Sequence, residues 1–303
     1  MERFSRLALI LGCVVAFTAA GCAQNAVTTT VPGARTNATR QLPTNYVGTR
    51  WTSRRSFVPT GRGTNPEIGS FGYNGGPVLI KPRLYLIFWG YHGGGDPDGV
   101  KALLVQYAKS VGGSSHDNIY TQYYGPSKQY IQNPRNQFGK AWFDDAAIPA
   151  NPTDKQVAAQ ALRFVKRFGY DPNGSYVVAT AHDHNSIGFG TQWCAYHGAT
   201  FDGKQVISYT NLPYIPDAGA NCGANYLSPP KDESGDDEGV TIIEGAMYGD
   251  SITDPYPDTG WYPEIGFWCA WDDIELDPFG KHAYATQPMF SLASNSCVQS
   301  YKK

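Results

Sequence analysis

The segment from Pro152 to Gly169 constrains the fold most, because it holds a helix start, a helical apolar period and a helix stop. Pro152-Thr153-Asp154 is a typical start and Gly169 a typical stop. The apolar residues between them recur three and four positions apart and form one stripe: Val157, Ala158, Ala161, Leu162, Val165 and Phe168. An apolar strand is predicted directly afterwards, from Ser175 to Asp183. This order predicts helices packed on a sheet.

The rest of the chain extends this pattern. A helix is predicted from Asp96-Pro97 to Gly112, after one or two strands in Pro77 to Gly90, of which Arg83 to Trp89 is the surest. Later strands are predicted at Lys204 to Ile215, Glu264 to Trp271 and His282 to Leu292. Helices and strands alternate early, and strands dominate late. The predicted fold class is therefore α/β (α+β mixed), a layered domain with a mixed sheet and flanking helices.

A further helix is predicted within Gly239 to Pro255, where apolar residues recur at helical spacing. Gly245 and Gly249 each cost about 1 kcal/mol relative to Ala inside a helix. They lie on one face, however, and would permit a close approach to the sheet. The acidic run before this segment is favourable at a helix N-terminus.

The N-terminus has the pattern of an export signal. Arg3 and Arg6 precede an apolar stretch, Leu7 to Ala19, that is too short to span a bilayer. Small residues then lead to Cys22, which resembles the bacterial lipobox, in which the Cys is lipidated. Ordinary signal-peptidase cleavage near Ala20 or Ala23 is the alternative.

The predicted organisation has three parts. Residues 1–21 form a lipoprotein signal peptide, 22–68 a flexible tether rich in Thr, Asn, Arg, Pro and Gly, and 69–303 one folded domain. The predicted location is extracytoplasmic, anchored to the bacterial cell envelope by lipid at Cys22. The net charge of -2 and pI near 6.3 argue against a nucleic-acid partner, which would require a basic face.

Four cysteines remain once Cys13 and Cys22 are set aside, and an oxidising compartment favours two disulfides with three conceivable pairings. We expect Cys194–Cys222 and Cys269–Cys297, because each closes a loop of about 28 residues, worth roughly 3–4 kcal/mol. Without a C-x-x-C pair, a zinc-thiolate site is not expected.

Several short blocks resemble known proteins: GGSSHDNIYTQYY, CAYHG, SITDP followed by GWY and EIGFWCAW, and YATQPMFSLASNSC. They are similar to blocks of bacterial secreted zincin-like proteins and, more distantly, of the plant phosphate-induced (EXORDIUM-like) family. The resemblance covers most of residues 71–297 and implies a zincin-like domain. In the bacterial relatives the block before T-D-P often reads S-H-E-x-x-E-x-x-T-D-P, a metal-binding helix.

Laid onto this chain, the resemblance places the His ligand at Ala246, the general base at Met247, the second acidic position at Asp250 and the Asp of T-D-P at Asp254. An Ala cannot ligate zinc, and a Met cannot accept a proton from metal-bound water. The resemblance therefore implies the fold and, together with these two residues, a domain without hydrolytic chemistry at this helix. Asp254 is also expected to close the turn before Pro255.

Other residues could rebuild a metal site for zinc or calcium, although no cofactor is expected. The candidate ligands are His182 and His184, two apart on a predicted strand, together with His197, Asp250, Asp254 and Glu264. The alternative is that the strand ends at Ala181, which leaves both histidines in a loop. The alternation of Asp232, Ser234, Asp236 and Glu238 resembles a calcium loop, but its sixth and twelfth positions are Asp237 and Ile243, so a solvated loop is favoured. Ser114, Ser115 and His116 are not expected to form a catalytic group.

Aromatic residues could hold a ligand, since exposed Tyr and Trp stack on sugar rings or grip extended peptides. The candidates are Tyr123, Tyr124, Trp261, Tyr262 and Trp268. The alternative is that many of these rings fill the core.

Three functions follow from the sequence. The first is a surface-tethered lipoprotein with a catalytically degenerate metallohydrolase-like domain, a pseudoenzyme that binds an extracellular glycan or peptide. The second is an active metal-dependent, peptidase-like hydrolase with a rearranged metal site. The third is a structural envelope protein without a ligand.

Overall fold

The structure is a computed structural model that describes residues 46–48, 71–227 and 234–302. These residues belong to one compact unit, Leu42–Lys303. The predicted signal peptide, the lipidation site Cys22, most of the predicted tether, and Asp232 lie outside the described residues.

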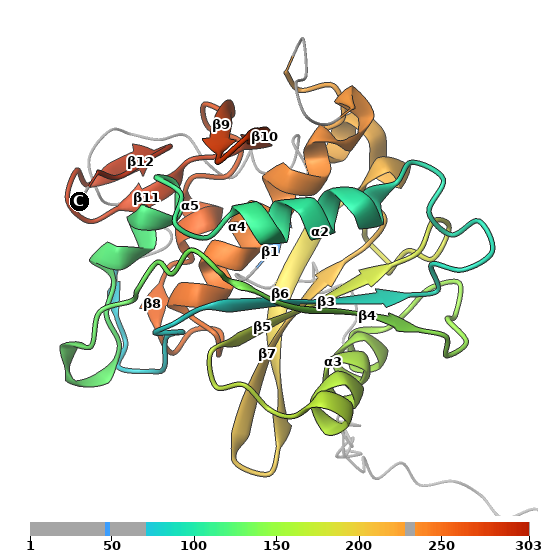
Figure 1. Cartoon of the computed structure of the whole chain (residues 1–303), viewed down its shortest axis with the longest axis horizontal. Helices are drawn as coiled ribbons and strands as arrows, with labels where there is room; N and C mark the ends of the chain where they lie inside the picture. Colours follow the sequence, from blue (N-terminus) through green and yellow to red (C-terminus); the bar gives the residue numbers. More distant parts are fainter. Residues whose placement is uncertain (1–45, 49–70, 228–233, 303) are drawn as a thin grey trace, which may run out of the picture. The chain divides into compact units, whose positions relative to one another are not determined.

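A six-stranded mixed sheet is the centre of the fold (Figure 1). In the order β1-β6-β7-β5-β3-β4, its strands are β1 (Tyr46–Gly48), β6 (Trp193–Asp202), β7 (Gln205–Leu212), β5 (Gly174–Thr180), β3 (Arg83–Trp89) and β4 (Phe138–Asp144). Strands β7, β5, β3 and β4 are mutually parallel, whereas β6 and β1 run antiparallel to their neighbours. The predicted α/β mixed fold is confirmed.

Four α-helices and three small sheets surround this sheet within the described residues. The helices are α2 (Val100–Ser110), α3 (Asp154–Phe168), α4 (Glu238–Thr253) and α5 (Ile265–Trp268). The small antiparallel pairs are β2 (Gly72–Tyr73) with β8 (Trp261–Tyr262), β9 (Glu275–Phe279) with β10 (His282–Thr286), and β11 (Met289–Ser291) with β12 (Ser296–Val298). Short 3-10 helices are η1 (Asp117–Gln122), η2 (Pro126–Lys128), η3 (Ile215–Cys222) and η4 (Gly235–Asp237).

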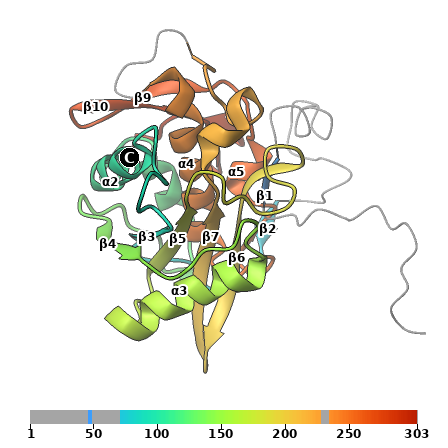
Figure 2. The same ribbon diagram turned by 90° about the vertical axis from the view of Figure 1, so that its right-hand side faces the viewer.

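The helices form layers on both faces of the sheet, with α2 and α4 on one face and α3 on the other (Figures 1 and 2). Alternate residues of β3 explain how both layers are held, because successive strand side chains point to opposite faces. Leu84, Leu86 and Phe88 pack with α2 and α4 in one core, while Ile87 and Trp89 pack with α3 in a second core.

Helix α4 lies between the sheet and the C-terminal elements. It packs against β6 and β7 on one side and against β10 and α5 on the other, so that every one of its residues is buried. A helix enclosed on all sides needs no polar stripe, which explains its apolar residues on several faces. Its glycines permit this close packing: a Cβ on Gly249 would lie 2.8 Å from the Tyr120 hydroxyl oxygen, and one on Gly245 would lie 3.0 Å from that of Tyr107.

Both predicted disulfides are present. Cys194 on β6 is bonded to Cys222 at the end of η3, and Cys269, just after α5, is bonded to Cys297 on β12. Each bond spans a sequence separation of 28. Disulfides are typical of proteins that fold in an oxidising compartment outside the cytoplasm. Among the described helices, none combines the length and apolar character needed to cross a membrane.

Three predicted elements need correction. The strand predicted to reach Asp183 ends at Thr180, where His184 N–H donates to the Ala181 carbonyl and turns the chain. The predicted strand Glu264 to Trp271 contains the short helix α5 instead, because a short apolar run has no period that separates strand from helix. Helix α2 begins at Val100 rather than at Asp96, since Gly99 at its N-cap has a left-handed φ of 83°.

The tether prediction also needs correction at three residues. Tyr46–Gly48 lies within 22–68 yet forms β1, which pairs with β6 at the sheet edge and has Val47 fully buried. Two other strands of the central sheet, β4 and β6, were not predicted, and neither were the short strands β2, β8, β9 and β12.

Candidate functional site

The two positions that the sequence resemblance aligns with a His ligand and a Glu base lie in the core. Ala246 and Met247 occupy the middle of α4 and are fully buried among apolar side chains. Gly266 packs on the same turn, where an added Cβ would lie 2.9 Å from the Ala246 carbonyl oxygen. These two positions therefore line no solvent-exposed cleft in the described part of the chain and offer neither a ligand nor a base.

The two acidic residues at aligned positions, Asp250 and Asp254, accept hydrogen bonds from backbone N–H groups. Asp254 accepts hydrogen bonds from the N–H groups of Asp258 at 2.7 Å and Gly260 at 2.6 Å, which confirms that it closes the turn after α4. Asp250 accepts from Gly266 N–H at 2.6 Å and thereby ties α5 to α4. Burial raises the pKa of Asp254 to about 6 against the opposing effect of its backbone donors.

His197 and Glu264 meet beside these carboxyl groups. His197 Nε2, on β6, lies 2.9 Å from Glu264 Oε1, and both side chains are fully buried. Burial lowers the pKa of His197, and burial followed by the charge of Asp254 raises that of Glu264 well above its usual range. Both directions favour the uncharged form of the group concerned. The pKa of Asp250 is also raised well above its usual range, first by burial and then by Glu264.

The four predicted ligands His197, Asp250, Asp254 and Glu264 are thus brought into one buried region. Their donor atoms do not, however, form a group that would suit a metal ion, as judged over residues 71–227 and 234–302. The region is better described as a buried polar network that joins α4, α5 and β6. The Oδ2 atom of Asp250 and the Oε2 atom of Glu264 find no hydrogen-bond partner in the described structure, which is costly unless these groups stay protonated.

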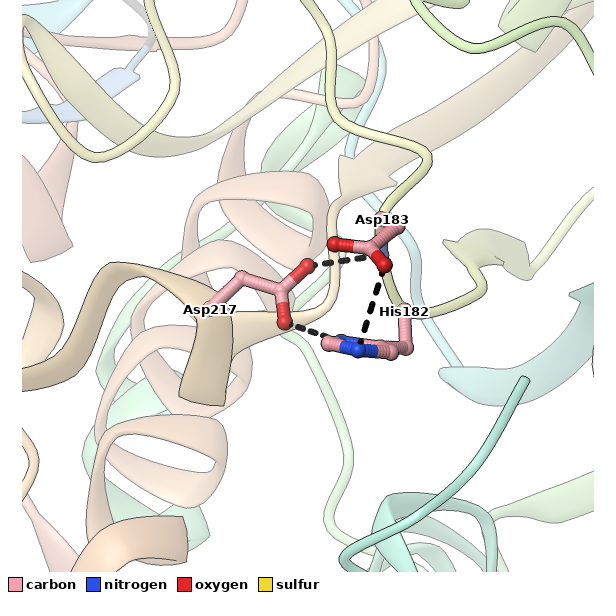
Figure 3. A group of neighbouring side chains, drawn as sticks. All are labelled: His182, Asp183 and Asp217. Carbon is pink, nitrogen blue, oxygen red and sulfur yellow. Dashed lines mark hydrogen bonds and ion pairs between the residues drawn. The ribbon is translucent and has the colours of Figure 1, made fainter. Parts of the chain in front are cut away.

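A second group of metal-ligating side chains lies near the surface (Figure 3). His182 and Asp183 follow β5, and Asp217 lies on η3 after β7, so the group forms where two adjacent parallel strands end. Carboxyl ends of parallel strands are the usual place for ligands in α/β folds. One donor atom from each residue lies within 4.8 Å of the other two.

Hydrogen bonds hold this group together. His182 Nδ1 lies 2.5 Å from Asp217 Oδ1, and Asp217 Oδ2 accepts from Asp183 N–H at 2.9 Å and from the Asn185 amide at 2.7 Å. His182 Nε2 lies 3.3 Å from Asp183 Oδ2. The hydrogen bond to Asp217 raises the pKa of His182. Because metal ligation needs neutral imidazole, protons would compete with any ion here.

The other predicted histidine ligand does not join this group. His184 Nδ1 contacts the Pro149 carbonyl oxygen at 2.9 Å, and the turn after Thr180 separates it from His182. Asp183 and Asp217 were missed from the sequence. Asp183 is the last residue of one predicted strand and Asp217 follows another, and this position at strand ends is the signal that could have found them.

The acidic segment that resembles a calcium loop, for which a solvated loop is favoured from the sequence, is described only from Ser234 onward. Its described side chains serve the start of α4: Ser234 Oγ donates to Asp237 at 2.6 Å, and Glu238 accepts from Leu227 N–H at 2.7 Å. Asn225 donates to Asp236 at 2.6 Å.

Most of the aromatic candidates belong to the core. Tyr123 is fully buried, and Trp261 and Trp268 are 5% and 8% exposed. The three rings pack around Phe71, with ring centroids 5.8 to 6.3 Å from it. These three rings fill the core, as the alternative interpretation has it, and form no exposed stacking surface, whereas Tyr124 and Tyr262 are half-buried.

Searches with protein-family models, among curated proteins and among solved structures find no match to this chain.

Proposed function

We propose that the chain is a lipid-anchored protein of the bacterial cell envelope that binds an extracellular glycan or peptide without cleaving it. Its domain retains the helix of a zincin-like metallohydrolase and lacks the chemistry of that helix. The observation that carries the proposal is the burial of Ala246 and Met247, both 0% exposed, at the two positions that a hydrolase of this type needs for ligand and base.

Two further observations support the proposal. The remaining acidic positions, Asp250 and Asp254, accept backbone hydrogen bonds and so serve the fold. The two disulfides agree with an extracytoplasmic location. Cys22, after its run of small residues, is the proposed lipid attachment site, and a lipid of this kind would hold the domain at a membrane surface.

Metal analysis and binding tests on the same sample examine this proposal. The mature chain, purified without a tag, is dialysed with and without chelator and then incubated with wall polysaccharide and with envelope peptides. We expect substoichiometric metal, binding that chelator leaves unchanged, and full recovery of uncleaved ligand. Metal-dependent cleavage would contradict the proposal.

A second candidate function is a metal-dependent, peptidase-like hydrolase with a rearranged site. The convergence of His182, Asp183 and Asp217 favours it, since three protein donors with positions left for water are typical of catalytic zinc. Zinc titration followed by peptide-cleavage assays tests it. Cleavage that is lost in Asp217→Asn and retained in His184→Gln would establish this function and exclude the binding-only one.

A further inference from the structure

The outer edge of β4 has no partner strand among the described residues. Strand β4 is the last in the order of the central sheet and pairs with β3 alone (Figure 1). After a bulge at Gly139, Lys140 to Asp144 pair regularly with Tyr85 to Trp89. Alternate residues of this five-residue run therefore present their backbone N–H and C=O groups at the outer edge, where an added strand can use them.

Two cavities flank this edge, one on each face of the sheet. The larger, about 800 Å³, lies between α2 and β4 and is lined by Val105, Phe138, Ala141 and Phe143 together with lysines. The smaller, about 370 Å³, lies on the α3 side against Phe164 and Phe168. Both cavities reach Gly139 and Lys140. Successive side chains of an extended peptide point to opposite faces, so one strand laid along β4 would fill both cavities in alternation.

Cations surround the same edge. Lys101 and Lys109 lie over the rings of Phe143 and Phe138, at 5.4 and 5.6 Å from the ring centroids. Lys140 lies 4.5 Å above Phe168 on the other face. Arg163 and Arg167 both lie 5.8 Å from Trp142.

Few acidic groups offset these cations. Asp144 is paired with Arg163 at 3.0 Å, and Asp171 in the smaller cavity accepts from the Tyr85 hydroxyl at 2.7 Å. Asp145 is also exposed, beyond the end of the strand, and contacts His92. In a chain of net charge -2, this edge is a local basic strip and complements an acidic ligand.

From this arrangement we infer that the edge of β4, between α2 and α3, binds an extended acidic peptide as an added strand. Backbone hydrogen bonds to Lys140 through Asp144 would supply affinity. The larger, apolar cavity selects apolar side chains on the α2 face, and the cations of the α3 face, Lys140, Arg163 and Arg167, select acidic side chains there. The inference rests on the proposed binding function and commits it to a peptide ligand.

The test uses the mature chain and a labelled peptide that alternates Glu with Val, followed by fluorescence anisotropy. A Lys–Val peptide is the charge control. Two further versions of the Glu–Val peptide carry N-methyl groups on alternate residues. In one version the Glu residues are methylated, and in the other the Val residues. We expect binding of the Glu–Val peptide that weakens with salt, no binding of the Lys–Val peptide, and loss of binding in at least one N-methylated version.

Substitutions at the edge of β4 test whether the peptide binds there. Lys109→Glu/Lys140→Glu should weaken binding about tenfold or more. Lys155→Glu, an exposed residue in the first turn of α3 that lines neither cavity, is the matched control and should bind as the unaltered chain does.

If both N-methylated peptides bound as tightly as the unmodified Glu–Val peptide, the inference would be overturned, since charge alone would then explain the affinity. Absence of Glu–Val binding would overturn it too. If wall polysaccharide still bound in that case, the proposed binding function would stand without this site, whereas metal-dependent cleavage would remove the proposed function itself.

Discussion

At the scale of single residues, burial decides what the polar groups of α4 can do. Ala246 and Met247 are enclosed by apolar side chains, and Glu244, Asp250 and Glu264 have their pKa values raised well above the usual range, with burial as the first cause. Burial favours the uncharged form of such carboxyl groups, which hold the fold through hydrogen bonds where these exist. The motif positions thus act as core residues.

Restoring the hydrolase residues should therefore damage the fold. Met247→Glu places a carboxylate in a fully buried position without a partner and should cost about 3–5 kcal/mol of the free energy of unfolding. Met247→Leu conserves volume and should cost less than about 1.5 kcal/mol. Urea unfolding followed by circular dichroism measures both. Equal stability of the Glu variant and the unaltered chain would show that the position is accessible to water.

Glu244 should make stability depend on pH. Both of its oxygens lack a hydrogen-bond partner in the described structure, and burial raises its pKa well above the usual range. Below about pH 4.3 the folded and unfolded chains both hold this proton. As pH rises further, the unfolded chain releases the proton first, so the free energy of unfolding falls until the pH passes the raised pKa of the folded state.

Glu244→Gln cannot ionise and removes this effect. The free energy of unfolding of the variant, minus that of the unaltered chain, should be larger at about pH 8 than at about pH 4 by at least about 1 kcal/mol. Urea unfolding at both values measures the gain. Glu275→Gln, at an exposed carboxyl on β9, is the control and should change little at either pH. If the stability difference between the variant and the unaltered chain were the same at both pH values, it would contradict a pKa of Glu244 raised by burial.

At the scale of elements, local signals explain the helices well. Helix α3 begins at Asp154, as its start signal predicts, because Thr153 and Gln156 form a reciprocal capping box. Helix α4 formed in spite of Gly245 and Gly249, since packing on Tyr107 and Tyr120 requires residues without a side chain there. Short apolar runs such as Glu264 to Trp271 lack such signals, and their structure depends on their neighbours.

The capping box gives a prediction for α3. Thr153→Ala removes the acceptor for the Gln156 N–H and should lower the free energy of unfolding by about 1 kcal/mol, within a range of roughly 0.5–2 kcal/mol. Lys155→Ala, at an exposed position two residues later, is the control and should change it by less than about 0.5 kcal/mol. Thermal and urea unfolding measure the difference. A Thr153→Ala cost no larger than that of the control would mean that the cap contributes nothing.

At the scale of the whole molecule, the disulfides connect elements that the sheet does not. Cys194–Cys222 joins β6 to η3, and Cys269–Cys297 joins the end of α5 to the C-terminal strand β12. Strand β10 and helix α5 cover α4, and the second disulfide ties the end of α5 to the β11–β12 pair, which packs on α5.

Removal of either disulfide should destabilise the domain by a similar amount. Both close loops of the same sequence separation, 28, and the chain-entropy relation gives about 3–4 kcal/mol for each. The double variants Cys194→Ala/Cys222→Ala and Cys269→Ala/Cys297→Ala, compared by urea unfolding, serve as each other's controls. A loss below about 1 kcal/mol in either would show that its loop is already constrained in the unfolded chain.

The sequence by itself determined the features that depend on neighbours along the chain. Residues three and four positions apart define α3 and α4, the apolar run Arg83 to Trp89 defines β3, and two equally spaced cysteine pairs match the two disulfides. These features could be predicted because helix caps, strand composition and loop closure are local properties.

Only the tertiary structure decided which side chains meet and which are excluded from water. It brought Asp217 to His182 across 35 positions, buried Tyr123 and Trp261 in the core, and left β4 as the open edge between two cavities. Burial and long-range contact depend on how layers stack on the sheet, and that stacking minimises apolar exposure over the whole chain rather than within any one segment.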